Sequence, residues 1–364
     1  MSVTNRTERD GSLDAFRGLT VLLMMLVNLQ GSDETAFWFL KHAAWHGLTL
    51  ADLVFPWFLL VVGIAIPLTA DTRPHPPFRH ALVRAAKLFA LGIMIGWLLR
   101  PTLDPGDVRW AGVLQRIAIV YITCVWIVRR SAGYRLAACC AAALLVLHSA
   151  LLLGVAAPGT AAPSLLPGQG ISGWLDQHVL PGRSHHAGWD PEGVLSTLSA
   201  IATGLMGVAV QRWRQGLPSS SPNTLAGIIV GVALVIAGLL LSPHIPLNKS
   251  LWTSSYALVA AGLGIILWMV VREIWRRFGR NFVTDMLELL GRSALTAYVL
   301  HMVLIAALIR PVIHGKTGWT MGYDWFAASG LSGPWSSLAF SVIALAPVLL
   351  AIPMLVSRGW TLKL

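Results

Sequence analysis

The sequence predicts an all-α integral membrane protein, a bundle of about ten transmembrane helices with both termini in the cytoplasm. Hydrophobic residues make up 55% of the 364 residues and charged residues only 12%, whereas a soluble domain carries roughly 25% charged residues. The apolar residues come in blocks of about 20, the length that crosses a hydrocarbon core of about 30 Å. Basic residues gather in every second connection between the blocks. These three observations exclude an ordinary soluble domain.

The apolar blocks, taken in chain order, give the predicted transmembrane segments. We place them at 14–31, 52–70, 81–100, 111–128, 134–155, 193–211, 224–242, 251–271, 287–309 and 336–357. They form a single polytopic domain, 14–357, between a cytoplasmic tail at 1–13 and another at 358–364. The connection at 156–192 is long and rich in glycine and proline, and we expect it to be an extracytoplasmic loop.

The orientation follows from the distribution of lysine and arginine. The even-numbered connections and the two ends carry most of them: Arg6, Arg9 and Arg17; Arg73, Arg79, Arg84 and Lys87; Arg129, Arg130 and Arg135; Arg212 and Arg214; Arg272, Arg276, Arg277 and Arg280; Arg358 and Lys363. Basic residues favour the cytoplasmic side of a membrane. These basic residues also account for the net charge of +11, because they anchor the protein at the anionic cytoplasmic leaflet. We therefore predict no nucleic-acid partner.

The entrance to the second span carries ionisable groups that a membrane boundary holds only at a cost in free energy. Residues 41–58 read KHAAWHGLTLADLVFPWF, with His42, His46 and Asp52 just before a wholly apolar stretch. Such a cluster is tolerated where it lines a wet cavity. Asp52 is explained either as part of a capping box with Thr49 or as the carboxylate that polarises an imidazole.

Further polar residues fall inside or beside other predicted spans. On the extracytoplasmic side these are Asn28, Gln115, Arg116, Asp190, Glu192, Asn248 and Lys249, and His301 lies near the middle of the ninth span. Asn28 either forms a contact between helices or has a functional role. His301 is either a packed core histidine or a functional residue. Asp14 and Arg17 share a helix face at the cytoplasmic end. Arg17 serves there either as half of an anchoring ion pair or as a phosphate ligand.

Five segments together resemble one family. SLDAFRG at 12–18, KHAAWHGLTLADLVFPWF at 41–58, GVLQR at 112–116, WDPEG at 189–193 and PLNKSLW at 246–252 are similar to the heparan-α-glucosaminide N-acetyltransferases, including bacterial members. The resemblance implies that the acetyl group of cytoplasmic acetyl-CoA is transferred across the membrane to the amine of a glucosamine-type sugar. It also implies a multi-pass protein of the bacterial inner membrane.

The resemblance implies roles for particular residues. His42 matches the family's catalytic histidine, and Asn28 matches an asparagine close to it. With Asp52 they form the expected catalytic set: a base, an oxyanion donor and an orienting carboxylate. His46 stands where the animal enzymes carry asparagine, and its purpose stays open. The expected substrate-binding residues are Gln115, Arg116, Asp190, Glu192, Asn248, Lys249 and His301, and the expected ligands of CoA phosphates are Arg17, Arg84, Lys87 and Arg292.

Two other functions fit the same residues. One is a permease for an amino sugar such as N-acetylglucosamine, in which the extracytoplasmic cluster binds but does not react. The other is an O-acyltransferase of an envelope glycan, although there the first span ends in histidine where this chain has Asn28. We predict no metal site. The lipid bilayer, acetyl-CoA and the amino sugar are the expected partners, and a homodimer is compatible with the sequence.

Overall fold

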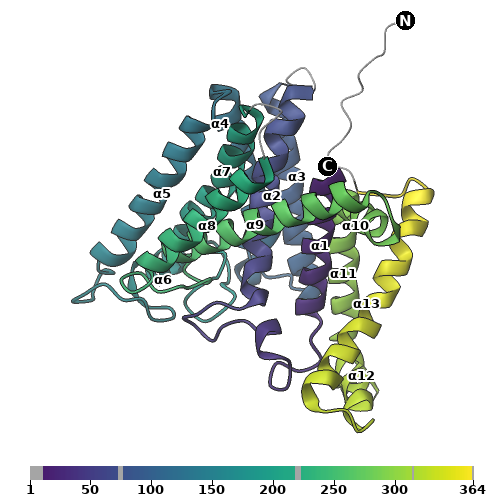
Figure 1. The fold of residues 1–364 in the computed structure, drawn as a ribbon. Coiled ribbons are helices and arrows are strands. Elements are labelled where there is room, and N and C mark those ends of the chain that lie inside the picture. The colour runs from purple at the N-terminus through teal and green to yellow at the C-terminus, as the bar shows by residue number, and fades with distance from the viewer. Residues whose placement is uncertain (1–10, 73–76, 218–222, 314, 363–364) are drawn as a thin grey trace, which may run out of the picture.

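The computed structural model describes residues 11–72, 77–217, 223–313 and 315–362, and its helices run alongside one another as a bundle (Figure 1). The long helices are α1 (Gly11–Asn28), α2 (Leu50–Thr72), α3 (Phe78–Leu99), α4 (Val113–Arg130), α5 (Tyr134–Gly154), α7 (Val194–Gln215), α8 (Asn223–Leu241), α9 (Ser254–Phe278) and α13 (Gly333–Ser357). Shorter elements are η1 (Trp38–Leu40), η2 (Pro105–Asp107), α6 (Gly170–Val179), α10 (Phe282–Arg292), α11 (Ala294–Leu308), α12 (Gly318–Ala327), and an antiparallel pair, β1 (Pro311–Ile313) with β2 (Lys316–Thr317).

The structure confirms a helical membrane protein, with two corrections to the predicted spans. Among the described residues, eight helices are long and apolar enough to cross a membrane, or up to nine if one bent pair counts as a span. The ninth predicted span, 287–309, is that pair: α10 and α11 meet at an angle of 81°. The fourth predicted span, 111–128, corresponds to a single helix, α4. This helix is not among the eight, because it carries three arginines. One of them, Arg116, is only 1% exposed, so its charge does not face lipid.

The ends of the bundle can be named by their residues. The beginning of α1 and the end of α13 lie at the same end of the molecule (Figure 1). We call it the arginine end, because Arg17, Arg84 and Arg129 lie there on α1, α3 and α4. The opposite end, the His42 end, carries the loop 41–49 and the long connection between α5 and α7.

Glycines let the central helices approach closely. A Cβ atom on Gly63 of α2 would lie 1.9 Å from the carbonyl oxygen of Gly204 on α7. One on Gly262 of α9 would lie 2.5 Å from the carbonyl oxygen of Gly231 on α8. Small residues at helix crossings are typical of membrane proteins, where van der Waals packing drives association.

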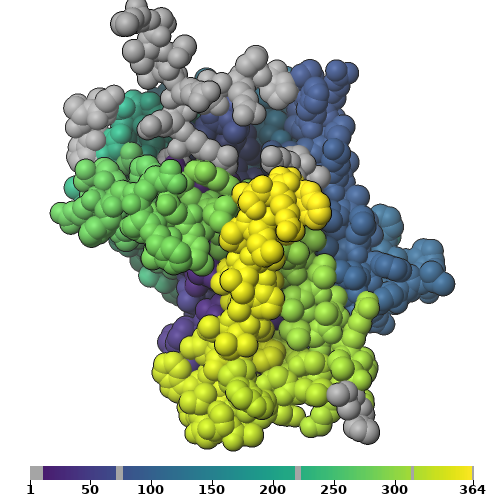
Figure 2. All heavy atoms as spheres, turned by 90° about the vertical axis from the view of Figure 1, so that its right-hand side faces the viewer, coloured from purple at the N-terminus to yellow at the C-terminus, as the bar shows by residue number. Residues whose placement is uncertain are grey.

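Apolar side chains cover the outer helices. On α8 the exposed ones include Leu225, Ile229, Ile236 and Leu240, and α3 and α13 carry similar sets. Figure 2 shows α13 lying across one face of the molecule, between the α9–α10 region and α3. Such faces are stable in lipid and costly in water.

Two hydrogen bonds join α2 to α9 and so fix the helix that carries Asp52. The hydroxyl of Tyr256 donates to the carbonyl oxygen of Asp52 at 2.6 Å. The indole Nε1 of Trp57 donates to the carbonyl oxygen of Ala260 at 3.0 Å. The entrance of α2 is therefore held rigidly against the core.

Candidate active site

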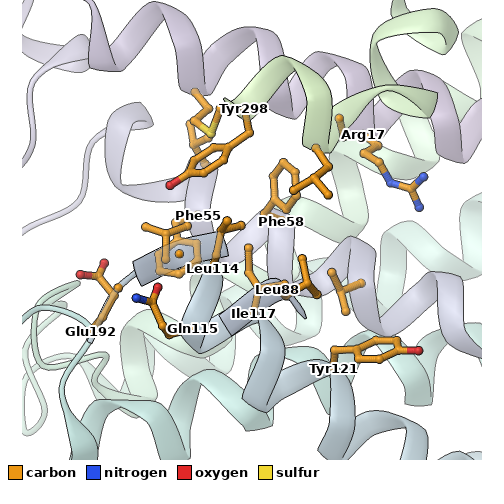
Figure 3. Close-up of a pocket in the computed structure, with 18 of the residues that line it drawn as sticks. Arg17, Phe55, Phe58, Leu88, Leu114, Gln115, Ile117, Tyr121, Glu192 and Tyr298 are labelled. Atoms are coloured by element: carbon orange, nitrogen blue, oxygen red, sulfur yellow. The ribbon is translucent and has the colours of Figure 1, made fainter. Parts of the chain in front are cut away.

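A continuous cavity of about 2170 Å³ extends along the inside of the bundle. Its lining includes Leu13 and Asn28 of α1, near opposite ends of that helix, and Ala51 and Ala70 of α2. At 1.5 Å per residue, the stretch of α2 alone spans about 28 Å. Figure 3 shows Arg17 and Glu192 on opposite sides of an apolar middle formed by residues that include Phe55, Phe58 and Leu88. The cavity therefore connects the two ends of the protein.

The arginine end of the cavity is lined by basic residues. All four expected phosphate ligands, Arg17, Arg84, Lys87 and Arg292, are part of the lining, as are Arg79 and Arg129. Arg17 pairs with Asp14 at 3.1 Å, and Arg292 pairs with Glu288 at 2.6 Å. The sequence indicates only a role as topological anchors for Arg79 and Arg129, because nothing in their spacing shows that they face inward. This end suits an anionic ligand.

At the opposite end, His42 and Asp52 form a hydrogen-bonded pair. The imidazole Nδ1 lies 2.8 Å from Oδ1 of Asp52, whose side chain is 1% exposed, while the His42 side chain is 48% exposed. Because a carboxylate only accepts hydrogen bonds, the geometry assigns the proton to Nδ1. The lone pair of Nε2 is then available to take a proton from a substrate.

Asp52 also holds the loop before α2. Its Oδ2 accepts hydrogen bonds from the backbone N–H of Ala43 and of Thr49, both at 3.1 Å. The bond from the backbone N–H of Thr49 to Asp52 is one half of the predicted capping box. The other half, from the backbone N–H of Asp52 to the Thr49 hydroxyl, does not form. That hydroxyl instead lies 2.6 Å from the carbonyl oxygen of Lys41 and 3.0 Å from Oδ2 of Asp52. The two explanations of Asp52 therefore apply together: one carboxylate caps the loop and holds the imidazole.

Lys249 places a second ionisable group against His42. Its Nζ lies 3.1 Å from Nδ1 and 3.3 Å from Nε2 of His42, and 3.8 Å from Oδ1 of Asp52. Burial lowers the pKa of Lys249, and the neighbouring charge of Asp52 opposes this effect only in part. Lys249 and Asn28 both line the His42 end of the cavity.

Asn248 and His46 belong to the scaffold around this site. The amide Nδ2 of Asn248 lies 3.3 Å from Nδ1 of His46, and its Oδ1 accepts the backbone N–H of Leu251 at 2.8 Å. Neither Asn248 nor His46 is part of the cavity lining. Their contact joins the loop that carries His42 to the turn that carries Lys249.

The acidic residues of the WDPEG segment are held by Arg109, which the sequence did not single out. Arg109 donates to both carboxylate oxygens of Asp190, at 2.8 and 2.6 Å, and also to Glu192. Burial alone would raise the pKa of Asp190, but the hydrogen bond and charge of Arg109 lower it below its usual value. Glu192 lines the cavity, whereas Asp190 lies behind it, 2% exposed.

A second buried carboxylate supports the same segment from α6. Asp176 accepts the backbone N–H of Asp190 at 3.0 Å and that of Val194 at 2.8 Å, so it caps the start of α7. Burial raises the pKa of Asp176 to about 6. The position of Glu192 thus depends on two buried groups, Arg109 and Asp176.

The remaining expected binding residues divide between the cavity and the core. Gln115 lines the cavity and packs against Gly92 and Gly112. Arg116 points away from it, donates to Ser196 and lies 5.0 Å from the ring centroid of Trp252. His301 is fully buried outside the described lining, and neither of its ring nitrogens has a hydrogen-bond partner among the described residues.

Comparison with known proteins confirms the family resemblance. Residues 9–164 match the family model described as "Heparan-alpha-glucosaminide N-acetyltransferase, catalytic". The human protein named heparan-alpha-glucosaminide N-acetyltransferase is 27% identical over 324 residues, which cover 72% of this chain and 48% of the relative. The mouse protein of that name is 26% identical over 359 residues, covering 80% and 53%. The chain spans about half the length of these relatives, which are acyltransferases by name.

Proposed function

We propose that this chain, a relative of the heparan-alpha-glucosaminide N-acetyltransferases, transfers the acetyl group of acetyl-CoA to the amine of a glucosamine-type sugar. One observation carries the proposal: a single cavity has a basic mouth at one end and the His42–Asp52 pair at the other. The arginine end faces the cytoplasm, in keeping with the preference of basic residues for that side. The His42 end faces the extracytoplasmic side of a bacterial inner membrane.

The residues of the arginine end fit the charged part of acetyl-CoA. Arg17, Arg84, Lys87 and Arg292 supply guanidinium and ammonium donors for phosphate oxygens. Beyond them, Phe55, Phe58 and Leu88 make the passage apolar, which suits the uncharged arm that carries the thioester. Bound in this way, acetyl-CoA supplies an activated acetyl group, and the length of the passage allows that group to reach the opposite end.

His42 acts as the general base. Its Nε2 accepts the proton that the sugar amine loses as the new C–N bond to the acetyl carbon forms. It then delivers this proton to the sulfur as the C–S bond breaks, so that the products are the amide and the free thiol. Asp52 keeps the proton on Nδ1 and fixes the ring. General-base catalysis of this kind contributes typically about 10²–10⁴-fold to the rate.

Polar groups around His42 stabilise the transition state and hold the acceptor. Asn28 and Lys249 are donors at the same end of the cavity, and a donor aimed at the developing oxyanion is worth about 3 kcal/mol in other enzymes. Glu192 and Gln115 also line the cavity (Figure 3) and offer directional hydrogen bonds to sugar hydroxyls.

The test uses purified protein in detergent with labelled acetyl-CoA and glucosamine. We expect a product that resists mild base, as an amide does and an ester does not. His42→Ala should reduce kcat by about 10²-fold or more, whereas His46→Asn, in the same loop but outside the cavity lining, should change it only slightly. Full activity in the His42→Ala variant would refute the role given to His42.

A cavity that reaches both ends is also what an amino-sugar permease requires. Transport and transfer separate in vesicles that contain no acetyl-CoA. Uptake of labelled N-acetylglucosamine under that condition would favour the permease. Acetylation that depends on acetyl-CoA, without uptake in its absence, supports the transferase.

A further inference from the structure

A second cavity lies on the lipid-facing side of α3. It has a volume of about 420 Å³ and is lined mainly by apolar residues of α3, with Val299 of α11 across from them. Met94 and Trp97 of this lining are 64% and 49% exposed. Because exposed apolar side chains of α3 face lipid, this groove between α3 and α11 opens toward the membrane interior.

The groove and the main cavity meet at α3. Ile95, Gly96 and Arg109 line both. Gly96 lacks a side chain at this junction, and a Cβ atom built there would meet nothing within 4 Å. At this point the wall between the two spaces therefore includes the backbone of Gly96 with no side chain on it, which places the lipid-facing groove next to the cavity that His42 lines.

Arginines surround the end of the groove nearest His42. Arg100, Arg109 and Arg183 line it together with Asp107. Arg100 and Arg183 share this one carboxylate, at 3.4 and 3.6 Å, and their side chains are 60% and 26% exposed. Two guanidinium groups against one carboxylate leave net positive charge where α3 ends and its apolar stretch gives way to polar loops. A guanidinium group is well suited to phosphate.

We propose that the groove holds a lipid-linked acceptor, an amino sugar joined through phosphate to an isoprenoid or acyl chain. The chain lies against Met94, Trp97 and Val299, the phosphate lies at Arg100 and Arg183, and the sugar passes Gly96 toward His42. This proposal rests on the proposed acetyl transfer and names its substrate class. Phosphatidylglycerol shares the chain and phosphate but has no amine for His42 to deprotonate.

The decisive variant is Gly96→Phe, because a Cβ atom at this position meets nothing within 4 Å and a phenyl ring beyond it adds bulk at the junction. Its control is Gly154→Phe at the end of α5, where a Cβ atom also meets nothing within 4 Å and which lies outside both cavity linings. Two acceptors are compared, free glucosamine and glucosaminyl phosphoryl polyprenol. For each, kcat/KM is measured with saturating acetyl-CoA.

We expect the wild-type protein to prefer the lipid-linked acceptor, with kcat/KM about tenfold higher or more. Gly96→Phe should lower the ratio of kcat/KM for the lipid-linked acceptor to kcat/KM for free glucosamine about tenfold. Gly154→Phe should leave this ratio unchanged. The double variant Arg100→Gln, Arg183→Gln should lower it as well. An unchanged ratio in Gly96→Phe, or no preference in the wild-type protein, would overturn the proposal.

A binding measurement without acetyl-CoA separates this proposal from the proposed function. Binding of glucosaminyl phosphoryl polyprenol to the wild-type protein should be weakened in Gly96→Phe and should resist competition by phosphatidylglycerol. If phosphatidylglycerol competes equally, the groove is an ordinary lipid site and the proposal fails. If binding behaves as expected but neither acceptor is acetylated, it is the proposed acetyl transfer that fails.

Discussion

Asp52 connects the position of His42, the proposed base, to the shape of the loop that carries it. One oxygen accepts from the His42 ring and the other from the backbone of Ala43 and Thr49. Any shift of this carboxylate therefore moves the imidazole and the loop together. An amide keeps one accepting oxygen but replaces the other with a donor, which cannot accept Nδ1–H.

Asp52→Asn should accordingly lower kcat by about 10²-fold or more, with little change in KM for either substrate. Steady-state kinetics of the purified variant measure this. Asp33→Asn is the matched control, because Asp33 lines the same cavity without contacting His42. A loss confined to KM would mean that Asp52 binds substrate and does not orient the base.

Arg109 is the only arginine that holds both carboxylates of the WDPEG segment among the described residues. Arg109→Ala leaves these two groups without their buried partner, which should destabilise the fold by about 3 kcal/mol or more. Thermal unfolding in detergent should show a clearly lower midpoint, while exposed Arg310→Ala should leave it nearly unchanged. Equal midpoints for the two variants would contradict this role.

Contacts within one short segment of the site were predictable from the sequence, whereas contacts between distant segments were not. His42, Thr49 and Asp52 lie within eleven positions, so their contact follows from a helix start and a short loop. Arg109 and Asp190 are 81 positions apart, and only the folded chain brings them together. Arg116 and His301 were expected in the site because they are polar residues in apolar helices, but the face each presents is set by neighbouring helices.

The helix pair α1–α10 depends on two glycines. A Cβ atom on Gly291 would lie 1.8 Å from the carbonyl oxygen of Asp14, and one on Gly18 1.9 Å from that of Leu287. Gly291→Ala should therefore push α10 away from α1 and destabilise the protein by about 1–3 kcal/mol. The midpoint of thermal unfolding measures this. Gly154→Ala, in open space, is the control, and an equal effect of both would contradict the packing argument.

The contact between α6 and α7 should respond to pH through Asp176. Burial raises its pKa to about 6 from an ordinary value of 3.8, and its charged neighbours include Asp190 and Arg116. Between these values the folded protein holds a proton that the unfolded chain releases, so this group favours folding more as pH falls. The contribution is at most about 3 kcal/mol and is lost as pH rises through about 6.

Asp176→Asn removes this titration. Relative to that variant, the wild-type protein should gain thermal stability as the pH is lowered from about 7 to about 4.5. Melting curves of both proteins over this range measure the difference. A difference that stays constant with pH would show that Asp176 does not titrate there.

At the level of elements, apolar runs predicted where helices lie but not where they bend. Within the segment 287–309, the polar residues Arg292 and Ser293 stand at the break between α10 and α11, but polar residues alone do not specify an 81° turn. The turn becomes explicable only once α10 is seen packed on α1 through Gly18 and Gly291. The short helices α6 and α12 lie in connections between the long helices, where no long apolar run predicts a helix.

The whole bundle separates the basic residues of the arginine end from the His42–Asp52 pair at the other end of the cavity. Arg84 and Lys87 lie in the first half of α3, at the arginine end, and His42 lines the opposite end of the cavity. The double variant Arg84→Gln, Lys87→Gln should raise KM for acetyl-CoA about tenfold or more and leave kcat almost unchanged. Lys316→Gln, an exposed residue at the other end, is the control. A fall in kcat alone would place these residues in the reaction.

The measurement that tests the central claim most directly is vectorial transfer in proteoliposomes of defined orientation. Labelled acetyl-CoA is supplied only on the side of the arginine end, and glucosamine only on the side of the His42 end. The account predicts that labelled N-acetylglucosamine forms on the glucosamine side and that His42→Ala abolishes it. Product formed only when both substrates share one side would contradict a transfer through the cavity.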